Sequence, residues 1–200
     1  MSKPIALTLV RTGATSWERA GRLAGCVDVP LCPEAAACCS ALAKEASVGV
    51  PTLILHAADQ ASTATADAIA AQTGAKSKEV EGLSEINLGL WAGLTEGALE
   101  ERSPSIWRMW REDPTAVSIP EGEQVEVAAD RVVASLLKAL GKVKGGTSVA
   151  VVLRPMSYGM VRCWLDSMPM TRLWEVVEQG ASVDRREIDR SRFRRDSAAS

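Results

Sequence analysis

The sequence is poor in residues that bind metals and lacks the cysteine spacing that zinc sites use. Its 200 residues include one histidine, His56, and five cysteines without a Cys-x-x-Cys pair. A structural zinc site takes four thiolate or imidazole ligands at short spacings. The odd number of cysteines, with no secretory signal, also argues against a disulfide framework. We therefore expect Cys32, Cys38 and Cys39 to be small buried apolar residues, and we expect no metal and no cofactor.

Long apolar runs and a strong net charge are also lacking. The apolar segment at residues 5–10 is too short for a signal sequence or a membrane span. No other stretch approaches the ~20 apolar residues that cross a bilayer. The formal net charge of −2 gives no electrostatic basis for binding nucleic acid. These absences predict a cytoplasmic protein that binds neither a membrane nor nucleic acid.

What the sequence does contain is an alternation of strand and helix signals. Short strand-like runs occur at residues 5–10, 51–55, 77–80 and 148–153. Helices are expected at residues 33–45, 62–72, 103–112, 122–140 and 158–165. Strands separated by helices predict an α/β fold of three layers around a mostly parallel sheet. Ligands of such sheets bind beyond the carboxyl ends of the strands, which points to the residues after Val10, Leu55, Val80 and Leu153.

The C-terminal residues 184–200 differ in composition from the rest of the chain. Six of them are arginines and four are acidic. A charge run of this kind is typical of a solvated or flexible end. We therefore predict one domain at residues 1–183 and a flexible arginine-rich tail at residues 184–200.

Five short motifs follow one another at the expected strand and helix junctions. They are Arg11-Thr12-Gly13, the Gly-Arg…Gly…Asp-x-Pro-Leu segment at 21–31, Thr65-Ala66, the segment 83–95, and Pro120-Glu121-Gly122-Glu123. In this order they resemble the histidine phosphatase superfamily, which includes the cofactor-dependent phosphoglycerate mutases. The resemblance covers residues 5–165. It implies a phosphoglycerate-mutase-like fold with a short helical cap between Trp91 and Pro120.

The resemblance also implies a reaction, phosphoryl transfer through a phosphohistidine. A neutral imidazole attacks phosphorus, two arginines and a second histidine hold the phosphate oxygens, and a carboxylic acid protonates the leaving oxygen. Arg11 and Glu85 match the first arginine and the acid. Thr12 stands at the position of the nucleophile, Ala61 at that of the second arginine, and Arg154 at that of the second histidine. The resemblance therefore implies a degenerate member that lacks the catalytic histidines.

His56 ends the second expected strand, near the rim of the implied pocket. It can replace the missing nucleophile only if it approaches phosphorus in line, within ~3–3.5 Å. A lone histidine at a strand end is more often a hydrogen-bonded structural residue. We favour the structural role, and the chemical role stays open.

Arg11, Glu85 and Arg154 allow two arrangements of the pocket. If Glu85 accepts hydrogen bonds from both arginines, the pocket is closed and structural, which the need to pair buried charges favours. If the arginines face the cavity, they form an anion site with one net positive charge among the three groups.

The sequence favours a catalytically inactive protein with a binding, regulatory or scaffolding role. In this hypothesis Arg11 and Arg154 bind a phosphate or carboxylate anion, and Glu85 is a vestigial acid. The first alternative is an active phosphatase or phosphomutase with a non-standard nucleophile such as His56 or Glu85. The second is a module that senses a phosphorylated metabolite. A protein partner or a homo-oligomer also stays open, although Trp107 and Trp110, which share one helix face, are expected to pack the cap against the core.

Overall fold

The computed structural model describes residues 3–179 and 182–189 and contains a five-stranded sheet. Its strands are β1 (Ile5–Arg11), β2 (Leu53–His56), β3 (Lys76–Glu79), β4 (Ser148–Leu153) and β5 (Val183–Ile188). Their spatial order is β3-β2-β4-β1-β5. The first four strands are parallel, and β5 pairs with β1 in the antiparallel sense. The predicted α/β fold with a mostly parallel sheet is confirmed.

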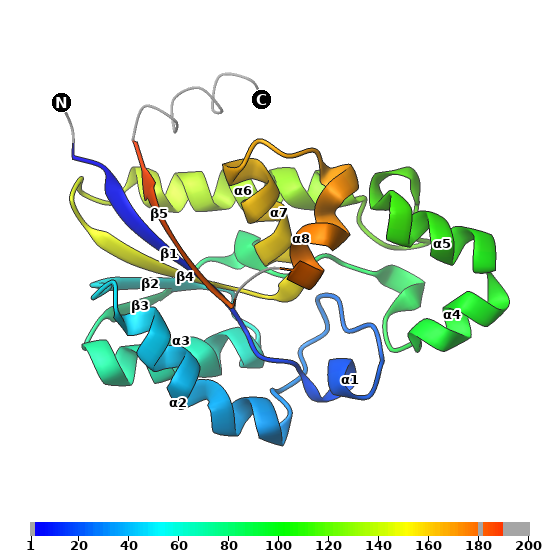
Figure 1. Cartoon of the computed structure of the whole chain (residues 1–200), viewed down its shortest axis with the longest axis horizontal. Helices are drawn as coiled ribbons and strands as arrows, with labels where there is room; N and C mark the ends of the chain where they lie inside the picture. The colour runs from blue at the N-terminus through cyan, green and yellow to red at the C-terminus, as the bar shows by residue number, and fades with distance from the viewer. Residues whose placement is uncertain (1–2, 180–181, 190–200) are drawn as a thin grey trace.

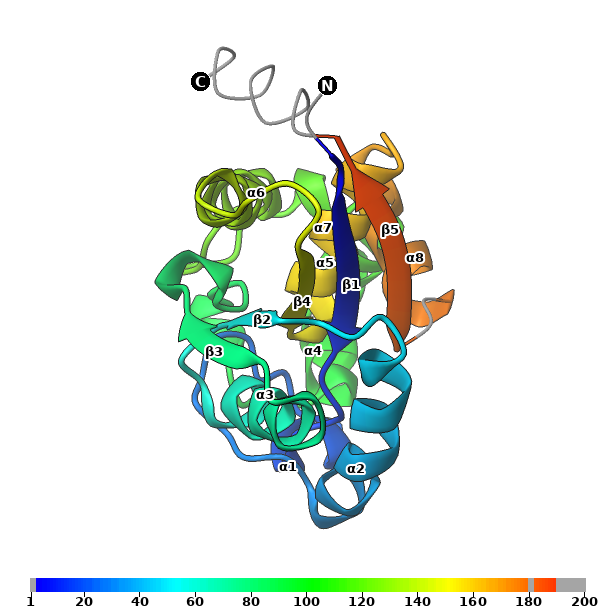
Figure 2. The same cartoon turned by 90° about the vertical axis from the view of Figure 1, so that its left-hand side faces the viewer.

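Helices cover both faces of this sheet (Figure 1). On one face lie α2 (Pro33–Ser47) and α3 (Gln60–Thr73), and on the other lie α6 (Val125–Gly141), α7 (Pro155–Leu165) and α8 (Leu173–Gln179). Figure 2, turned by 90°, shows the same separation of α2 and α3 from α6 and α7. The short α1 (Ser16–Arg19) follows β1. The single-turn helices are η1 (Glu81–Leu83), η2 (Gly89–Trp91), η3 (Pro114–Ala116) and η4 (Met170–Arg172).

Neighbouring residues of the central strands point into two different cores. Leu9 and Val151 pack with Leu136 of α6 on one face, whereas Val10 and Val152 pack against α2 and α3 on the other. Side chains alternate along a strand, so a strand buried on both faces has no polar side. This explains why β1 and β4 appear in the sequence as continuous apolar runs.

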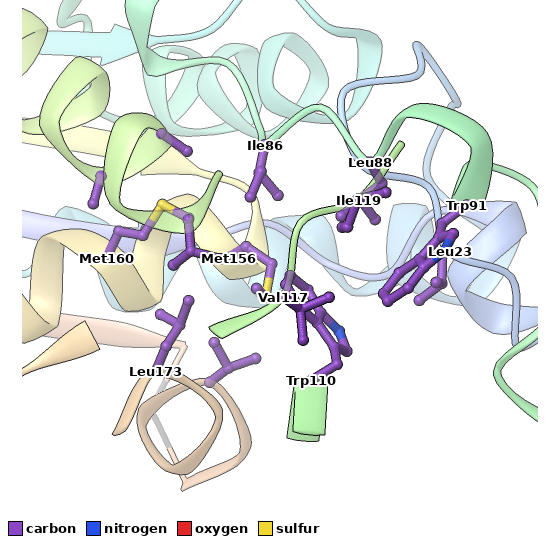
Figure 3. Close-up of a cluster of buried hydrophobic side chains, with 14 of the residues drawn as sticks. Leu23, Ile86, Leu88, Trp91, Trp110, Val117, Ile119, Met156, Met160 and Leu173 are labelled. Atoms are coloured by element: carbon purple, nitrogen blue, oxygen red, sulfur yellow. The ribbon is translucent and has the colours of Figure 1, made fainter. Parts of the chain in front are cut away.

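The cap between Trp91 and Pro120 contains α4 (Glu96–Arg102), α5 (Pro104–Glu112) and the single turn η3. Trp107 and Trp110 of α5 are both buried, which confirms that they pack the cap against the core. Trp110 makes edge-to-face contacts with Trp91 and Trp174, with ring centroids 5.5 and 6.0 Å apart. Figure 3 shows Trp91 and Trp110 within the apolar cluster between the cap and α7.

The predicted boundary of the tail is wrong. Residues 184–188 belong to β5, an edge strand in which Val183 and Ile188 are buried. Its charges are matched by neighbours, since Asp184 forms ion pairs with Arg162 and Arg186, both at 3.0 Å. An edge strand exposes charged side chains to solvent, so its composition resembles that of a flexible tail. This resemblance explains why the strand was not predicted. Residues 190–200 of the predicted tail lie outside the described residues.

Several helices also differ from expectation. The helix expected at 158–165 begins at Pro155, the one expected at 122–140 begins at Val125, and α1, α4 and α8 were not expected at all. Among the described residues, no helix is long and apolar enough to cross a membrane.

Candidate functional site

A cavity of about 320 Å³ lies beyond the carboxyl ends of β1 and β4. Arg11 and Thr12, which follow Val10, line it, and so do Pro155 and Met156, which follow the end of β4. The residues directly after Leu55 and Val80 are not among its lining residues. Two of the four strand ends singled out by the sequence therefore converge on the cavity.

The cavity has an apolar wall and a set of charged groups. The apolar side chains come from the cap, from α7 and α8 and from loops, and they are Leu23, Leu88, Trp110, Met156, Trp174 and Val177. The charged residues are Arg11, Arg22, Glu18, Glu85 and Glu96. Arg22 and Glu96 are exposed to solvent, whereas Glu85 is buried.

Glu85 holds the first turn of α7. One carboxylate oxygen accepts from the backbone N–H groups of Ile86 (3.0 Å) and Ser157 (2.8 Å) and from the Ser157 hydroxyl (2.9 Å). The other accepts from the N–H of Met156 at 2.8 Å. Two of the N–H groups that a helix N-terminus leaves unpaired thus gain an acceptor. Burial raises the pKa of Glu85, and the charge of Arg154 and these hydrogen bonds oppose that rise.

Arg154 is 1% exposed, and its charge is matched by two carboxylates. It donates to Glu18 at 2.9 Å and lies 3.7 Å from Asp59. Burial acts to lower the pKa of Arg154, but Glu18, Glu85 and Asp59 together keep it above its ordinary value. Arg154 does not line the cavity, although its partner Glu18 does.

The two arrangements foreseen for Arg11, Glu85 and Arg154 are therefore both wrong in detail. Glu85 accepts from backbone and serine donors, and in the described part of the chain it pairs with neither arginine. Glu18 and Asp59 add two carboxyl groups to the three expected ones, so two arginines face three acids. The net positive charge expected for the site is absent from this group.

Arg11 is the charged group of the cavity interior that lacks an oppositely charged partner within the described ranges. Its guanidinium donates one hydrogen bond, to the carbonyl oxygen of Val177 at 2.6 Å. The neighbouring Thr12 is 5% exposed, and its hydroxyl has no partner among the described residues. No side chain of this part of the chain is therefore placed to take the proton of the Thr12 hydroxyl.

Two other residues considered from the sequence lie away from the cavity. Ala61 is fully buried in the first turn of α3, and His56 is buried with its Nδ1 2.8 Å from the carbonyl oxygen of Ala57. Neither lines the cavity.

Sequence reasoning missed Glu18 and Asp59. Thr15 and Glu18 form a capping box on α1, a pattern that the sequence does display. Asp59 is the N-cap of α3, accepting from the N–H of Ser62 at 3.0 Å. The capping roles of both residues were recognisable in the sequence. That both carboxylates lie beside Arg154 depends on how α1, α3 and the start of α7 pack together.

The cysteines follow expectation only in part. Cys32 is buried as expected, but Cys38 is exposed and Cys39 is half-buried. The reason is that α2 turns only part of its surface to the sheet, with Ala43 and Ala46 fully buried. In the described part of the chain, no three His, Cys, Asp or Glu residues form a group that could hold a metal ion.

This distribution predicts a selective thiol reactivity. Iodoacetamide at pH 8 is expected to modify the exposed Cys26 and Cys38 of the native protein and to leave Cys32 and Cys163 intact, because the thiolate is the reactive form. Burial raises the pKa of Cys163 to about 11. Peptide mapping by mass spectrometry measures the sites, with urea-unfolded protein as the control in which all five cysteines react. Modification of Cys163 as fast as that of Cys26 would contradict the prediction.

Comparison with known proteins places these features in a family. The profile of the histidine phosphatase superfamily (branch 1) matches residues 7–199. Phosphoserine phosphatase 1 of Hydrogenobacter thermophilus is 25% identical over 178 residues, which are 89% of this chain and 84% of that protein.

Solved structures show the same fold. Bacillus stearothermophilus YhfR is 21% identical, with a TM-score of 0.78 over 85% of this chain and 84% of that one. A mycobacterial glucosyl-3-phosphoglycerate phosphatase, complexed with VO3, is 22% identical, with a TM-score of 0.77 over 91% and 96% of the two chains. The expected phosphoglycerate-mutase-like fold is thereby confirmed.

Proposed function

We infer that this chain, which belongs to the histidine phosphatase superfamily (branch 1), binds a small anion at Arg11 and does not transfer a phosphoryl group. In this proposal Thr12, Ala61 and Arg154 stand where the family has its nucleophile, second arginine and second histidine. Its role is then binding, regulation or scaffolding rather than turnover.

One observation carries the binding part of the proposal. Arg11 lines the cavity, donates one hydrogen bond to the Val177 carbonyl, and has no carboxylate partner within the described residues. A guanidinium has five N–H donors in a planar fork that suits carboxylate and phosphate oxygens. An anion in the cavity would use the donors that the protein leaves free.

The loss of turnover is supported by the groups around that arginine. Phosphohistidine chemistry requires an imidazole in the cavity, and the one histidine of the sequence, His56, does not line it. Thr12 is a weak nucleophile without a base. Arg154, which could clamp a phosphate, already pairs with Glu18 and Asp59.

The alternative is an active phosphatase with a non-standard nucleophile. The names of two of the relatives support it, because these two proteins are phosphatases. Glu85, whose pKa is raised by burial, is its candidate acid. Against it, both carboxylate oxygens of Glu85 already accept hydrogen bonds from the start of α7.

Activity and binding assays separate the two functions. Purified protein is expected to hydrolyse para-nitrophenyl phosphate and phosphoglycerate no faster than a blank and to acquire no acid-labile phosphoryl label. Calorimetric titration with phosphate and phosphoglycerate should give a saturable heat that Arg11→Ala removes, since the variant lacks the donor fork. Arg22→Ala, at the exposed rim, is the matched control that retains the heat.

Two results would overturn the proposal. Hydrolysis above blank by the wild type, lost in a Glu85→Gln variant that remains folded by circular dichroism, would establish the active alternative. No heat and no thermal shift with either anion would remove the binding function.

A further inference from the structure

We propose that the cavity selects a monoanionic carboxylate with an apolar or aromatic body over a phosphomonoester. This inference rests on the proposed anion binding at Arg11 and narrows its ligand class. Three features of the cavity carry it: its charge balance, its unpaired buried donors and its apolar wall.

The pairing of the interior charges leaves one arginine without a carboxylate partner, although the group as a whole has one more acid than it has arginines. In the interior, Arg154 is matched by Glu18 at 2.9 Å and Asp59 at 3.7 Å, which leaves Arg11 as the unmatched cation of the described residues. The rim carries one charge of each sign, Arg22, which donates to the carbonyl oxygen of Gly93, and Glu96. A phosphomonoester carries roughly −1.5 to −2 at neutral pH, so its second charge would face Glu18 and Glu85 without a cation. A carboxylate carries the single charge that Arg11 balances.

Two buried polar groups of the cavity wall lack a partner in the described part of the chain. They are the Thr12 hydroxyl, next to Arg11 at the end of β1, and the indole N–H of Trp110, on α5 of the cap. Trp110 is 1% exposed. A buried donor without an acceptor is unfavourable, and oxygen atoms of a bound ligand are the acceptors that both groups need.

The apolar wall defines the rest of the ligand. Leu23, Leu88 and Trp174 line the cavity together with the ring of Trp110. The volume of about 320 Å³ lies at the lower end of the roughly 300–1,000 Å³ typical of small-molecule sites. Such a wall gains free energy by covering hydrocarbon or an aromatic ring and gains none from a hydrated sugar or glycerol phosphate.

Glu18 determines the selectivity in this proposal. Its carboxylate both neutralises Arg154 and adds a negative charge to the cavity wall. Glu18→Gln removes that charge, and a glutamine can still complete the capping box on α1. The variant therefore tests the charge without deleting the cap.

The experiment compares matched probes by calorimetry at pH 8: 3-phenylpropionate, phenyl phosphate, inorganic phosphate and the neutral 3-phenylpropan-1-ol. Wild type is expected to bind 3-phenylpropionate about tenfold more tightly than phenyl phosphate, equivalent to ~1.4 kcal/mol. Glu18→Gln should remove most of that preference by strengthening phenyl phosphate. Arg11→Ala should lose both anions, and the neutral alcohol should bind more weakly than the carboxylate.

Each other outcome has a defined meaning. If phenyl phosphate binds wild type as tightly as 3-phenylpropionate, the carboxylate preference is wrong while the anion function of Arg11 stands. If Glu18→Gln leaves the ratio of the two affinities unchanged, the role of Glu18 is wrong, and Asp59→Asn provides a second measurement of the same charge effect. If no probe binds in an Arg11-dependent way, the proposed function falls together with this inference.

Discussion

Replacing Glu85 with alanine is expected to lower the free energy of unfolding by about 3–5 kcal/mol. The change removes the acceptor of four hydrogen bonds, from the N–H groups of Ile86, Met156 and Ser157 and from the Ser157 hydroxyl. These donors are buried, and water does not replace the carboxylate without opening the start of α7. The charge of Arg154 also loses a nearby negative group.

Denaturant unfolding followed by circular dichroism measures the effect of Glu85→Ala. For a chain of this size, a loss of that order lowers the melting temperature by roughly 10 °C. Glu96→Ala is the matched control, because Glu96 lines the same cavity but is exposed, and it should change stability by less than about 0.5 kcal/mol. Glu85→Gln should lie between the two, because an amide keeps one acceptor oxygen and turns a donor toward the N–H groups. A melting temperature of Glu85→Ala equal to that of Glu96→Ala would refute the capping role.

The second large effect is expected for the cap. Trp110→Ala should destabilise the protein by about 3–5 kcal/mol, the usual cost of truncating a buried tryptophan. Trp110 contacts Trp91 and Trp174, and its backbone carbonyl accepts the indole N–H of Trp174 at 2.7 Å. The substitution removes both ring contacts and leaves a void, whereas the backbone carbonyl that accepts from Trp174 is retained.

Matched variants on the same helix isolate the contribution of Trp110. Met109 is 45% exposed, so Met109→Ala should be nearly neutral, within about 0.5 kcal/mol. Trp110→Phe keeps an aromatic ring and should recover part of the loss, without restoring the indole N–H for a ligand. Chemical denaturation gives the stabilities. Equal stability of Trp110→Ala and Met109→Ala would show that the cap does not depend on this residue.

The fold was predictable from sequence because local and tertiary signals agree over most of the chain. β4 has the predicted bounds, 148–153, since its residues 149–153 form an uninterrupted apolar run that is buried on both faces. β5 was mistaken for a tail because its buried residues, Val183 and Ile188, stand only at its two ends. The start of α7 at Pro155 was missed because its cap comes from Glu85, 70 positions earlier in the sequence.

The site was predictable only where it follows from strand order. Arg11 and Thr12 converge with the end of β4 because β1 and β4 are adjacent parallel strands. The partners of Arg154 were not predictable, since Glu18 on α1 and Asp59 at the N-cap of α3 belong to segments whose relative position no local pattern specifies. The net charge of the cavity depends on those two residues. Its sign therefore could not be predicted from Arg11, Glu85 and Arg154 alone.

The position of Glu85 at the start of α7 gives this residue a role in folding that does not depend on any catalytic role. A carboxyl group that holds a helix terminus is retained by any chain that must fold, whether or not the chain turns over a substrate. Thr12 bears no such constraint, because its hydroxyl bonds nothing within the described residues. The presence of Glu85 is therefore poor evidence of turnover in this chain, because its hydrogen bonds to the start of α7 are reason enough to retain it.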